Sequence, residues 1–352
     1  MKKRILTGDR PTGRLHLGHY VGSLINRVKL QTEYETFIII ADVQALTTHW
    51  KEPERIRQAV FDVALDNLAV GIDPEITTLC VQSMIPEIAE LTILYGLFTN
   101  MNKLRHNPTT KAEALQYGMI GDNADLMTGF DQLTYGFFGY PVSQAADITF
   151  VRAHLVPVGE DQLPHIELCR DIVRKFNQLY GDGREIIPEP EALVSDVARL
   201  SALDGSTKMS KSLGNVINLS DEREEIEKMV WKAVTDPQKI HKNDKGHPEI
   251  CNVYKYHRIF NTRENSDIVE RDCKSGALGC VECKGRLTDV LDNLLAPIRE
   301  RRKQYEAKMK DVEEILREGT RRARIEGQET LKLVKEALKI DYFPLPEGFY
   351  GL

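Results

Sequence analysis

The first half of the chain alternates short apolar runs with helix-like segments, and this alternation constrains the fold more than any other feature of the sequence. Residues 4–7, 37–41 and 78–82 are apolar runs of a length that suits strands buried on both faces. Residues 19–32 and 53–70 lie between them, and apolar side chains recur at helical spacing in 53–70. The pattern predicts an α/β fold built on a doubly wound parallel sheet, whose ligands bind beyond the carboxyl ends of the strands.

The second half of the chain is mostly helical in pattern. Residues 104–131 contain one proline and several glycines, and we expect an irregular insertion there. Helical periodicity returns at 163–180 and dominates after Asp221, with a long, highly charged stretch at 287–339. We therefore predict a first domain over 1–217 and a helical second domain over 218–352.

Charge and hydropathy narrow the class of protein. The formal net charge is -6, which argues against a general DNA-coating protein but allows a local basic face that docks one structured RNA. No stretch approaches the roughly 20 apolar residues that cross a bilayer. The basic N-terminus lacks the apolar core and cleavage site of a signal peptide. We expect a cytoplasmic protein without a membrane partner.

Two segments far apart in the chain have the composition of a phosphate-binding site. A glycine-rich turn follows the first predicted strand and leads into a helix that carries His16 and His19, and backbone N–H groups at such a turn can approach a phosphate closely. Lys208 and Lys211 stand on a second segment bracketed by glycines, which predicts a cationic clamp. Each motif alone is more often plain surface, but the two together around a parallel sheet indicate nucleotide chemistry.

These motifs carry a resemblance to a known family. The residues from His16 to His19 (HLGH) resemble the HIGH signature of class I aminoacyl-tRNA synthetases, and residues 208–212 match the KMSKS signature letter for letter. Residues 7–13, 140–147 and 156–162 are similar to the tryptophanyl branch of that family. The resemblance implies a Rossmann-like catalytic domain and a helical anticodon-binding domain. It also implies an enzyme that activates tryptophan with ATP and loads it onto tRNA(Trp), in a homodimer.

The resemblance assigns an amino-acid pocket. Asp147 would accept the indole N–H of tryptophan, because an indole offers one donor and no acceptor. Tyr140 and Gln162 would hold the ammonium group. Arg10 stands where many relatives have glutamine, and would meet the substrate carboxylate or an ATP phosphate. Gln144 stands where methionine is common, so the fine geometry of the pocket stays open.

The resemblance also assigns the ATP site and the catalytic groups. His16, His19, Lys208 and Lys211, together with Mg²⁺, would meet the charge that grows on pyrophosphate as it leaves, and Lys111 would assist. Asp161 and Gly159 would hold the ribose. The full set predicted to bind ATP is Arg10, Pro11, Thr12, Gly18, His19, Gly159, Glu160, Asp161, Leu200, Lys208, Met209, Ser210, Lys211 and Ser212.

Six cysteines divide into two kinds. Cys80 and Cys169 lie in apolar segments and read as core residues. Cys251, Cys273, Cys280 and Cys283 are separated by 21, 6 and 2 residues, a set of thiolates that suits zinc or a [4Fe–4S] cluster. Some members of the family carry such a cluster with nearly this spacing, and the resemblance favours iron–sulfur over zinc.

Three rival functions remain at this stage. The related tyrosyl enzyme shares both signatures, although residues 140–147 and 159–162 favour tryptophan. A tRNA-binding paralogue without activity is the rival from another class, and the presence of both histidines and both lysines argues against it. A generic nucleotidyltransferase would leave the helical second domain unexplained. The basic stretches 299–303 and 321–324 are candidate tRNA contacts, though solvated helix faces are the commoner explanation.

Overall fold

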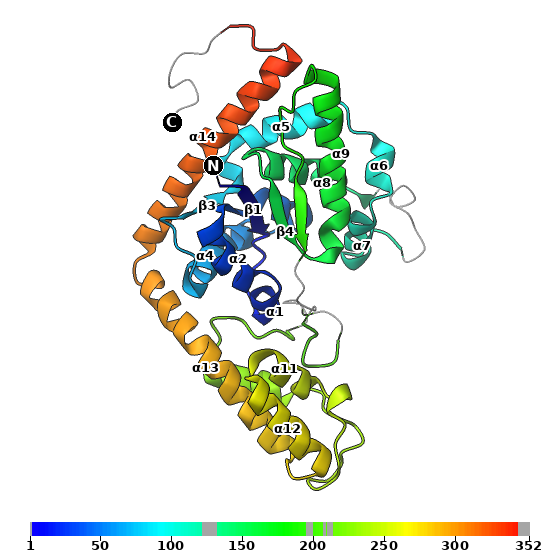
Figure 1. Cartoon of the computed structure of the whole chain (residues 1–352), viewed down its shortest axis with the longest axis vertical. Coiled ribbons are helices and arrows are strands. Elements are labelled where there is room, and N and C mark those ends of the chain that lie inside the picture. Colours follow the sequence, from blue (N-terminus) through cyan, green and yellow to red (C-terminus); the bar gives the residue numbers. More distant parts are fainter. Residues whose placement is uncertain (1, 122–131, 195–199, 207–208, 210–213, 344–352) are drawn as a thin grey trace.

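A five-stranded parallel sheet forms the centre of the larger lobe in the computed structural model, which describes residues 2–121, 132–194, 200–206, 209 and 214–343 (Figure 1). Each strand pairs with its neighbours in parallel, in the order β3-β2-β1-β4-β5. The order changes direction between β1 and β4, which makes this the switch point of the sheet. The strands are β1 (Arg4–Asp9), β2 (Glu35–Ile40), β3 (Thr77–Val81), β4 (Leu155–Val158) and β5 (Glu191–Val194).

The predicted doubly wound sheet is confirmed, and the three predicted strands are β1, β2 and β3. Strands β4 and β5 were not predicted. β4 contains Pro157, which cannot donate to a ladder, and this makes it hard to recognise as an inner strand. The structure accommodates it because β4 pairs along its length with β5 but meets β1 at a single register position, Ile5 opposite Leu155.

Helices cover both faces of the sheet. Residues alternate along β2, so that Ile38 and Ile40 join one core with α2 and α4, while Phe37 and Ile39 join the other with α5, α8 and α9. The helices of this lobe are α1 (Leu17–His19), the π-helical turn η1 (Tyr20–Leu24), α2 (Ile25–Glu33), α3 (Asp42–His49), α4 (Pro53–Val70), α5 (Pro86–Gly96), α6 (Met101–Arg105), α7 (Pro108–Gln116), α8 (Tyr135–Thr149) and α9 (Leu163–Tyr180).

α7 covers residues 108–116 of the predicted irregular insertion, so that expectation is wrong for this stretch, whereas the described residues 117–121 form no helix. Pro108 occupies the first turn of α7, where a missing N–H has no consequence. Asn107 caps the helix, because its side-chain oxygen accepts from the backbone N–H groups of Thr109 and Thr110. The proline that suggested irregularity is therefore a helix-start signal.

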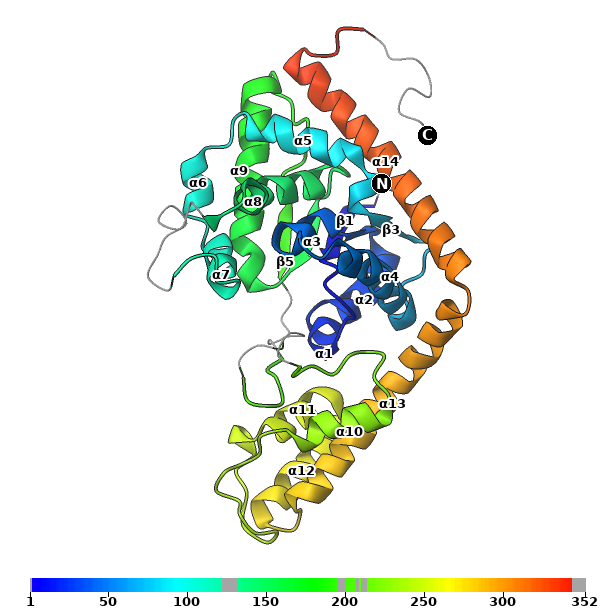
Figure 2. The same cartoon turned by 180° about the vertical axis from the view of Figure 1, so that it is seen from behind.

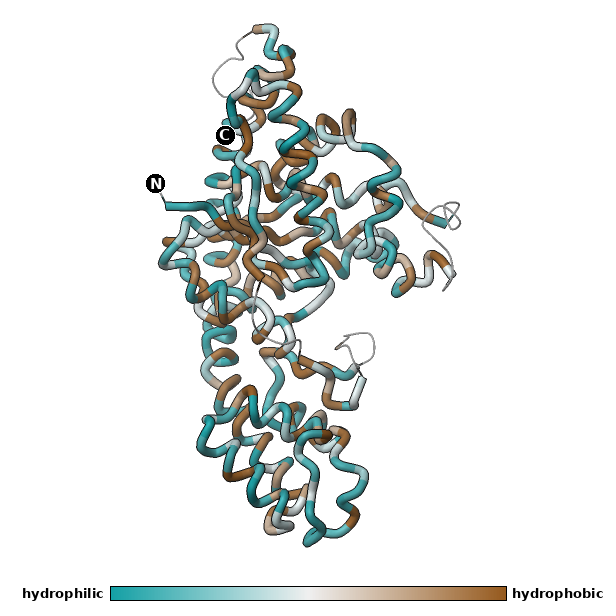
Figure 3. The backbone as a smooth tube through the Cα atoms, turned by 45° about the vertical axis from the view of Figure 1, so that its right-hand side comes forward, coloured by the Kyte–Doolittle hydropathy of each residue, from teal (hydrophilic) through white to brown (hydrophobic). Residues whose placement is uncertain are grey.

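A smaller helical lobe lies below the sheet in Figures 1 and 2. It consists of α10 (Arg223–Trp231), α11 (Asn252–Phe260), α12 (Arg263–Ser275) and the first part of α13 (Cys280–Glu306). The tube in Figure 3 shows apolar segments gathered at the sheet, whereas the smaller lobe is more polar. The boundary at 217 stays a prediction.

Two long helices connect the lobes. α13 rises out of the smaller lobe and packs on α4, and α14 (Met309–Leu338) then runs along the edge of the sheet beside β3 (Figure 2). The approach is close: a Cβ atom on Gly319 would lie 2.0 Å from the carbonyl oxygen of Leu79. α14 thus covers the outer edge of β3, a strand edge that would otherwise be open to pairing with another chain.

Several arginines in the basic stretches of these two helices form ion pairs within the protein. Arg299 pairs with Asp292 at 2.7 Å, and Arg302 pairs with Asp62 of α4 at 2.6 Å. Arg324 pairs with Glu87 of α5 at 3.1 Å. Arg302 and Arg324 tie α13 and α14 to the larger lobe, so these two residues of the candidate tRNA contacts are engaged within the protein. The tRNA contacts of the two stretches stay a prediction.

Candidate functional site

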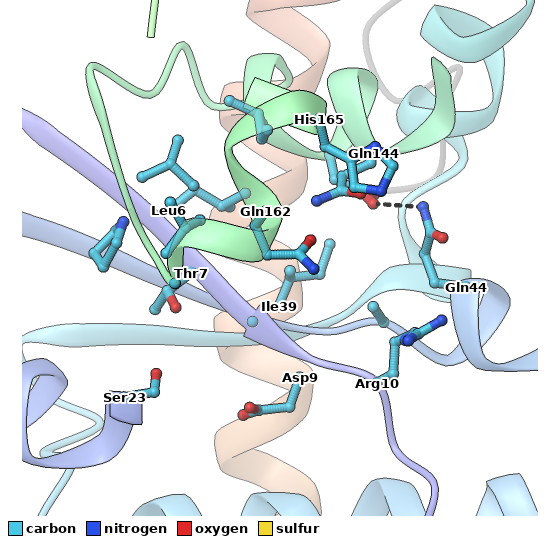
Figure 4. A pocket seen from close by; sticks show the side chains of 18 of the residues that line it. Leu6, Thr7, Asp9, Arg10, Ser23, Ile39, Gln44, Gln144, Gln162 and His165 are labelled. Carbon is cyan, nitrogen blue, oxygen red and sulfur yellow. Dashed lines mark hydrogen bonds between the residues drawn. The ribbon is translucent and has the colours of Figure 1, made fainter. Parts of the chain in front are cut away.

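A pocket of about 320 Å³ opens beyond the carboxyl ends of β1 and β4, at the switch point of the sheet (Figure 4). Its walls come from the end of β1, from β4 and from α8, which contributes Tyr140, Gln144 and Asp147. Gln162 lines the opposite side, at the start of α9. The location is where the topology of a doubly wound sheet places a ligand, and all four of these residues were predicted to bind the amino acid.

Asp147 is the buried carboxylate of this pocket, with 4 % of its surface exposed. The side chain of Gln82 donates to one of its oxygens at 2.7 Å. The side chain of Gln44, labelled in Figure 4, donates to the other oxygen at 3.3 Å. Burial raises the pKa of Asp147 to about 7, and the hydrogen bonds from the two glutamines only partly offset this effect. The carboxyl group therefore titrates near neutrality in the empty pocket.

Sequence reasoning missed the two glutamines that hold Asp147. Gln82 directly follows β3, and Gln44 lies in the first turn of the helix that follows β2. Polar residues at the end of a predicted strand (Gln82) or just beyond one (Gln44) were the signal that marks them, because the carboxyl ends of parallel strands meet at one edge of the sheet.

Arg10 crosses the mouth of the pocket to the helix α7. Its guanidinium pairs with the carboxylate of Glu113, with Nη2–Oε1 at 2.8 Å and Nη1–Oε2 at 3.4 Å. Both side chains line the pocket, and their exposed fractions are 35 % for Arg10 and 16 % for Glu113. Arg10 was predicted at this site, whereas Glu113 was not, because it belongs to the segment that was expected to be irregular.

Tyr140 joins a buried polar cluster at the same mouth. Its hydroxyl lies 2.9 Å from Nε2 of His165, and the Nδ1 of that ring lies 3.3 Å from the side-chain nitrogen of Asn107. Burial lowers the pKa of His165 to about 4, so the imidazole is neutral at pH 7. Burial also raises the pKa of Tyr140. Tyr140 thus presents a neutral, oriented hydroxyl to the pocket, as its predicted position requires.

The end of β1 is fixed by a second ion pair that sequence reasoning missed. Arg27 of α2 donates two hydrogen bonds to the carboxylate of Asp9, at 2.5 and 3.0 Å, and a third to the side-chain oxygen of Asn67. Burial acts to raise the pKa of Asp9, but the charge and hydrogen bonds of Arg27 outweigh it and hold the pKa below its usual value. Asp9 is therefore an ionised carboxylate whose charge is already neutralised.

The two signature histidines are locked by backbone contacts. Nδ1 of His16 accepts from the N–H of Gly18 at 3.1 Å, and Nδ1 of His19 accepts from the N–H of His16 at 3.2 Å. Their rings are 3.9 Å apart. Because Nδ1 is an acceptor in both neutral rings, the proton sits on Nε2, and each ring is a neutral Nε2–H donor.

Met209, the described residue of the second signature, lies against the first signature. A Cβ atom on Gly18 would be 3.1 Å from the sulfur of Met209, and residues 15–17 pair with the strand-like segment around Ile217. Leu17 N–H donates to the carbonyl of Ile217 at 2.9 Å. Of the predicted residues in the second signature, Met209 alone is among the described residues; Lys208, Ser210, Lys211 and Ser212 lie outside them.

Some of the predicted ATP-binding residues line the pocket, and others lie outside it. Arg10 and Gly159 line the pocket. Asp161 lies just beyond it, and its carbonyl accepts from the hydroxyl of Thr109 at 2.7 Å, which ties α7 to the turn η4 (Glu160–Gln162). Lys111 is on α7 but is absent from the described lining. The other predicted and described residues that do not line it are Pro11, Thr12, Gly18, His19, Glu160, Leu200 and Met209.

The four clustered cysteines converge in the smaller lobe. Cys251 precedes α11, Cys273 lies near the end of α12, and Cys280 and Cys283 lie in the first turn of α13, and all four line one small pocket. Burial raises the pKa of Cys283 to about 12, and the other three thiols add to this shift. Among the described residues, no group of three or more His, Cys, Asp or Glu side chains is placed to hold a metal ion.

The other two cysteines behave as predicted. Cys80 in β3 and Cys169 in α9 are fully buried in the core of the larger lobe. No helix in the described part of the chain is long and apolar enough to cross a membrane.

Comparison with known proteins connects this geometry to one family. The sequence profile described as tRNA synthetases class I (W and Y) matches residues 1–296. The chain is 48 % identical to a tryptophan–tRNA ligase of Streptococcus mutans, over 97 % of this chain and 99 % of the relative. It is 42 % identical to that of Aquifex aeolicus, over 96 % of this chain and all of the relative.

A solved structure is similar over the same extent. The tryptophanyl-tRNA synthetase of Campylobacter jejuni, crystallised with ADP and tryptophan, superposes with a TM-score of 0.83 at 30 % sequence identity. The match covers 96 % of this chain and 99 % of that one. Both lobes are therefore shared, and not the sheet alone.

Proposed function

This chain belongs to the class I tRNA synthetases of the tryptophan and tyrosine family, and on that premise we propose that the pocket around Asp147 is its tryptophan site. The chain is a tryptophan–tRNA ligase: it activates tryptophan with ATP and transfers the amino acid to the 3′ end of tRNA(Trp). The observation that carries the site is the buried carboxylate of Asp147, which lines the pocket and is held by the side chains of two glutamines.

The reaction has two steps. A carboxylate oxygen of tryptophan attacks the α-phosphorus of ATP, the bond to pyrophosphate breaks, and tryptophanyl-adenylate forms. The carboxylate is ionised at neutral pH, so the attack needs no general base. A ribose hydroxyl of the tRNA terminus then attacks the carbonyl carbon of the adenylate, and AMP leaves with the bonding electrons.

Asp147 selects the side chain. The indole N–H donates to the carboxylate, and the glutamines keep both oxygens in position. Phenylalanine has no donor and would leave this buried group without its partner. Sites built around such a polar contact reject the analogue that lacks it by roughly 10⁴–10⁵, and this makes an editing site unnecessary.

The neutral Nε2–H donors of His16 and His19 and the charges of Lys208 and Lys211 serve the ATP side. They bind phosphate oxygens and stabilise the charge that develops as pyrophosphate departs. Mg²⁺ bound to the triphosphate would neutralise further charge there. Gly159 and Asp161 hold the ribose, and Glu160, Pro11, Thr12, Gly18, Leu200, Met209, Ser210 and Ser212 complete the nucleotide site.

Exchange of labelled pyrophosphate into ATP tests the assignment. We expect exchange that depends on tryptophan, does not occur with tyrosine or phenylalanine, and is lost in Asp147→Ala. Exchange with tyrosine would identify the chain as the related tyrosyl enzyme. No exchange with any amino acid would indicate a tRNA-binding paralogue without activity. Glu167→Gln, on the exposed face of α9, is a matched control that should keep full activity.

The four cysteines of the smaller lobe are the proposed ligands of a [4Fe–4S] cluster. Cys251, Cys273, Cys280 and Cys283 line one pocket among apolar side chains, and the charge of Lys239 acts on Cys273. A single zinc ion, with Zn–S bonds of about 2.3 Å, would draw its sulfurs together around one point. A cluster distributes four thiolates over four irons, and the resemblance of this cysteine spacing to that of cluster-carrying members of the family is what supports iron–sulfur over zinc.

Metal analysis of protein purified without oxygen tests this proposal. We expect about four irons and four sulfides per chain, as the cluster requires, and their loss in Cys280→Ala but not in Cys80→Ala. One zinc per chain would establish the alternative, and a metal-free chain would exclude both.

The chain is also proposed to form a homodimer. Ile93 and Leu97 of α5 are 60 % and 75 % exposed, and Val43 and Met84 lie exposed on neighbouring elements. Exposed apolar side chains of this size support an interface with a second copy. Light scattering should give twice the mass of one chain, and Ile93→Lys should shift the protein to a monomer. A monomeric parent chain would refute the dimer.

A further inference from the structure

Glu113 is a pocket carboxylate that the reaction outlined above leaves without a role. It extends from α7 into the mouth of the pocket, where it meets Arg10 at 2.8 Å and contributes to the raised pKa of Tyr140. Its helix is held on both sides: Asn107 caps it, and Thr109 ties it to the carbonyl of Asp161. The carboxylate is therefore placed by a fixed helix.

An amino-acid substrate brings two charges into this pocket. Its carboxylate has a cationic partner in Arg10, but its ammonium needs an anion, because a buried charge without a partner is strongly unfavourable. Tyr140 and Gln162 offer only neutral oxygens. The described lining contains three carboxylates, and their present partners decide between them.

Asp9 is engaged by two hydrogen bonds from Arg27, which is itself buried. Asp147 is held by Gln82 and Gln44 at the far end of the pocket, where the indole binds. Glu113 alone is paired with a residue that the substrate itself must engage. When the substrate carboxylate meets Arg10, the negative charge of Glu113 becomes available for another cation.

Resting on the tryptophan function proposed above, we propose that Glu113 is the anionic partner of the substrate ammonium. Arg10 and Glu113 together then recognise the two opposite charges of the zwitterionic amino acid. The carboxylate of tryptophan forms an ion pair with Arg10, and its ammonium forms an ion pair with Glu113 beside Tyr140. The charges balance before and after binding: one ion pair in the empty pocket becomes two ion pairs of opposite polarity. Glu113 is thus a specificity residue for α-amino acids.

Two tryptophan analogues test the carboxylate and the ammonium contacts separately. Indole-3-propionate keeps the carboxylate and lacks the ammonium, and tryptamine keeps the ammonium and lacks the carboxylate. Both retain the indole that Asp147 binds. Their dissociation constants, measured by equilibrium dialysis on the whole protein, report the Glu113 and Arg10 contacts independently of turnover.

Glu113→Gln removes the charge but keeps the size of the side chain. We expect it to weaken tryptophan and tryptamine about 10- to 100-fold, the range for a hydrogen bond to a charged group. Binding of indole-3-propionate should be unchanged or tighter. Arg10→Gln should give the mirror image, with indole-3-propionate weakened and tryptamine unchanged or tighter. Glu167→Gln should alter none of these constants.

Other outcomes overturn the proposal. Equal weakening of indole-3-propionate and tryptamine in Glu113→Gln would mean that Glu113 only positions Arg10. Tighter binding of both would make it a counter-ion that blocks the site, and no change would make it a surface contact. If Glu113→Gln unfolds, Glu113→Asp takes its place, with the shortened carboxylate expected to weaken the same two ligands. Failure of tryptophan-dependent exchange in the parent chain would instead refute the function itself.

Discussion

Arg302 of α13 donates to one oxygen of the buried carboxylate of Asp66, and the other oxygen accepts the backbone N–H of Leu15 at 2.6 Å. Leu15 immediately precedes His16. The helix that leaves the smaller lobe is therefore joined, through a single side chain of α4, to the loop that carries the first signature. The position of that lobe and the position of the catalytic loop are mechanically linked.

Removing Arg302 should destabilise the protein strongly. Arg302→Met leaves the buried Asp66 without its cation, and breaking a buried pair in this way costs about 3–5 kcal/mol. Urea unfolding followed by circular dichroism would measure the loss. Asp66→Asn in the same background should recover part of it, because the unpaired charge is gone. A loss below about 1 kcal/mol, typical of exposed pairs, would contradict the buried network.

The affinity for tryptophan should depend on pH through Asp147. Its pKa is raised to about 7 by burial, and Gln82, Gln44 and the nearby charge of Asp42 are the groups that act on it. The ionised carboxylate is the stronger acceptor for the indole N–H. The dissociation constant of tryptophan should therefore fall as pH rises from 6 to 8, a trend that Asp147→Asn should abolish.

Asp147 also affects the stability of the folded protein, and this effect depends on pH in the opposite direction to tryptophan affinity. The pKa of Asp147 in the folded state lies above the ordinary value of 3.8, so the folded protein holds this proton more tightly than the unfolded chain does. The contribution is fully present below pH 3.8 and is lost as pH rises towards 7. Thermal unfolding of the ligand-free protein should show this loss relative to Asp147→Asn; parallel curves for the two proteins would exclude it.

The sequence predicts the fold where local pattern and environment agree. The runs that became β1, β2 and β3 are continuous and apolar because both faces of those strands are buried. β5 escaped notice because its residues are mostly exposed, so no apolar run marks it. α7 escaped because Pro108 was read as a breaker, whereas its place after Asn107 makes it the first turn of a helix.

The site is predictable in part for a similar reason. Tyr140, Asp147 and Gln162 stand within motifs of the family, and the pocket contains them all. Glu113, Gln44 and Gln82 are outside those motifs, and their roles depend on distances across the fold that spacing along the chain does not encode. Arg10 shows the difference: its place in the pocket was predictable, but its partner on α7 was not.

Thr320 should matter for the edge of the sheet. Its hydroxyl accepts the backbone N–H of Val81 at 3.1 Å, so α14 completes the hydrogen bonding at the end of β3. Thr320→Val keeps the shape but removes the acceptor, and a buried donor left unsatisfied costs about 1–3 kcal/mol. Chemical unfolding would measure this loss, and Thr320→Ser, which retains the hydroxyl, should recover most of it. Equal stability of the two variants would show that this bond contributes nothing.

Gly18 should be essential for turnover rather than for amino-acid binding. A Cβ atom there would lie 2.9 Å from Cε1 of His16 and 3.1 Å from the sulfur of Met209, so Gly18→Ala must displace the histidine ring and crowds the Met209 side chain. Displacing a preorganised donor lowers kcat by roughly 10²–10³, whereas the tryptophan pocket around Asp147 lies apart and should keep its affinity.

Gly22, one turn further along, provides the matched control, because a Cβ atom there meets nothing within 4 Å. Gly22→Ala should leave pyrophosphate exchange and tryptophan binding unchanged. If Gly18→Ala also retains full kcat, the contact of Met209 with the histidine loop has no part in catalysis. If it instead loses tryptophan affinity as much as kcat, the loop and the amino-acid pocket form one unit, and the separation of the two sites inferred from their positions fails.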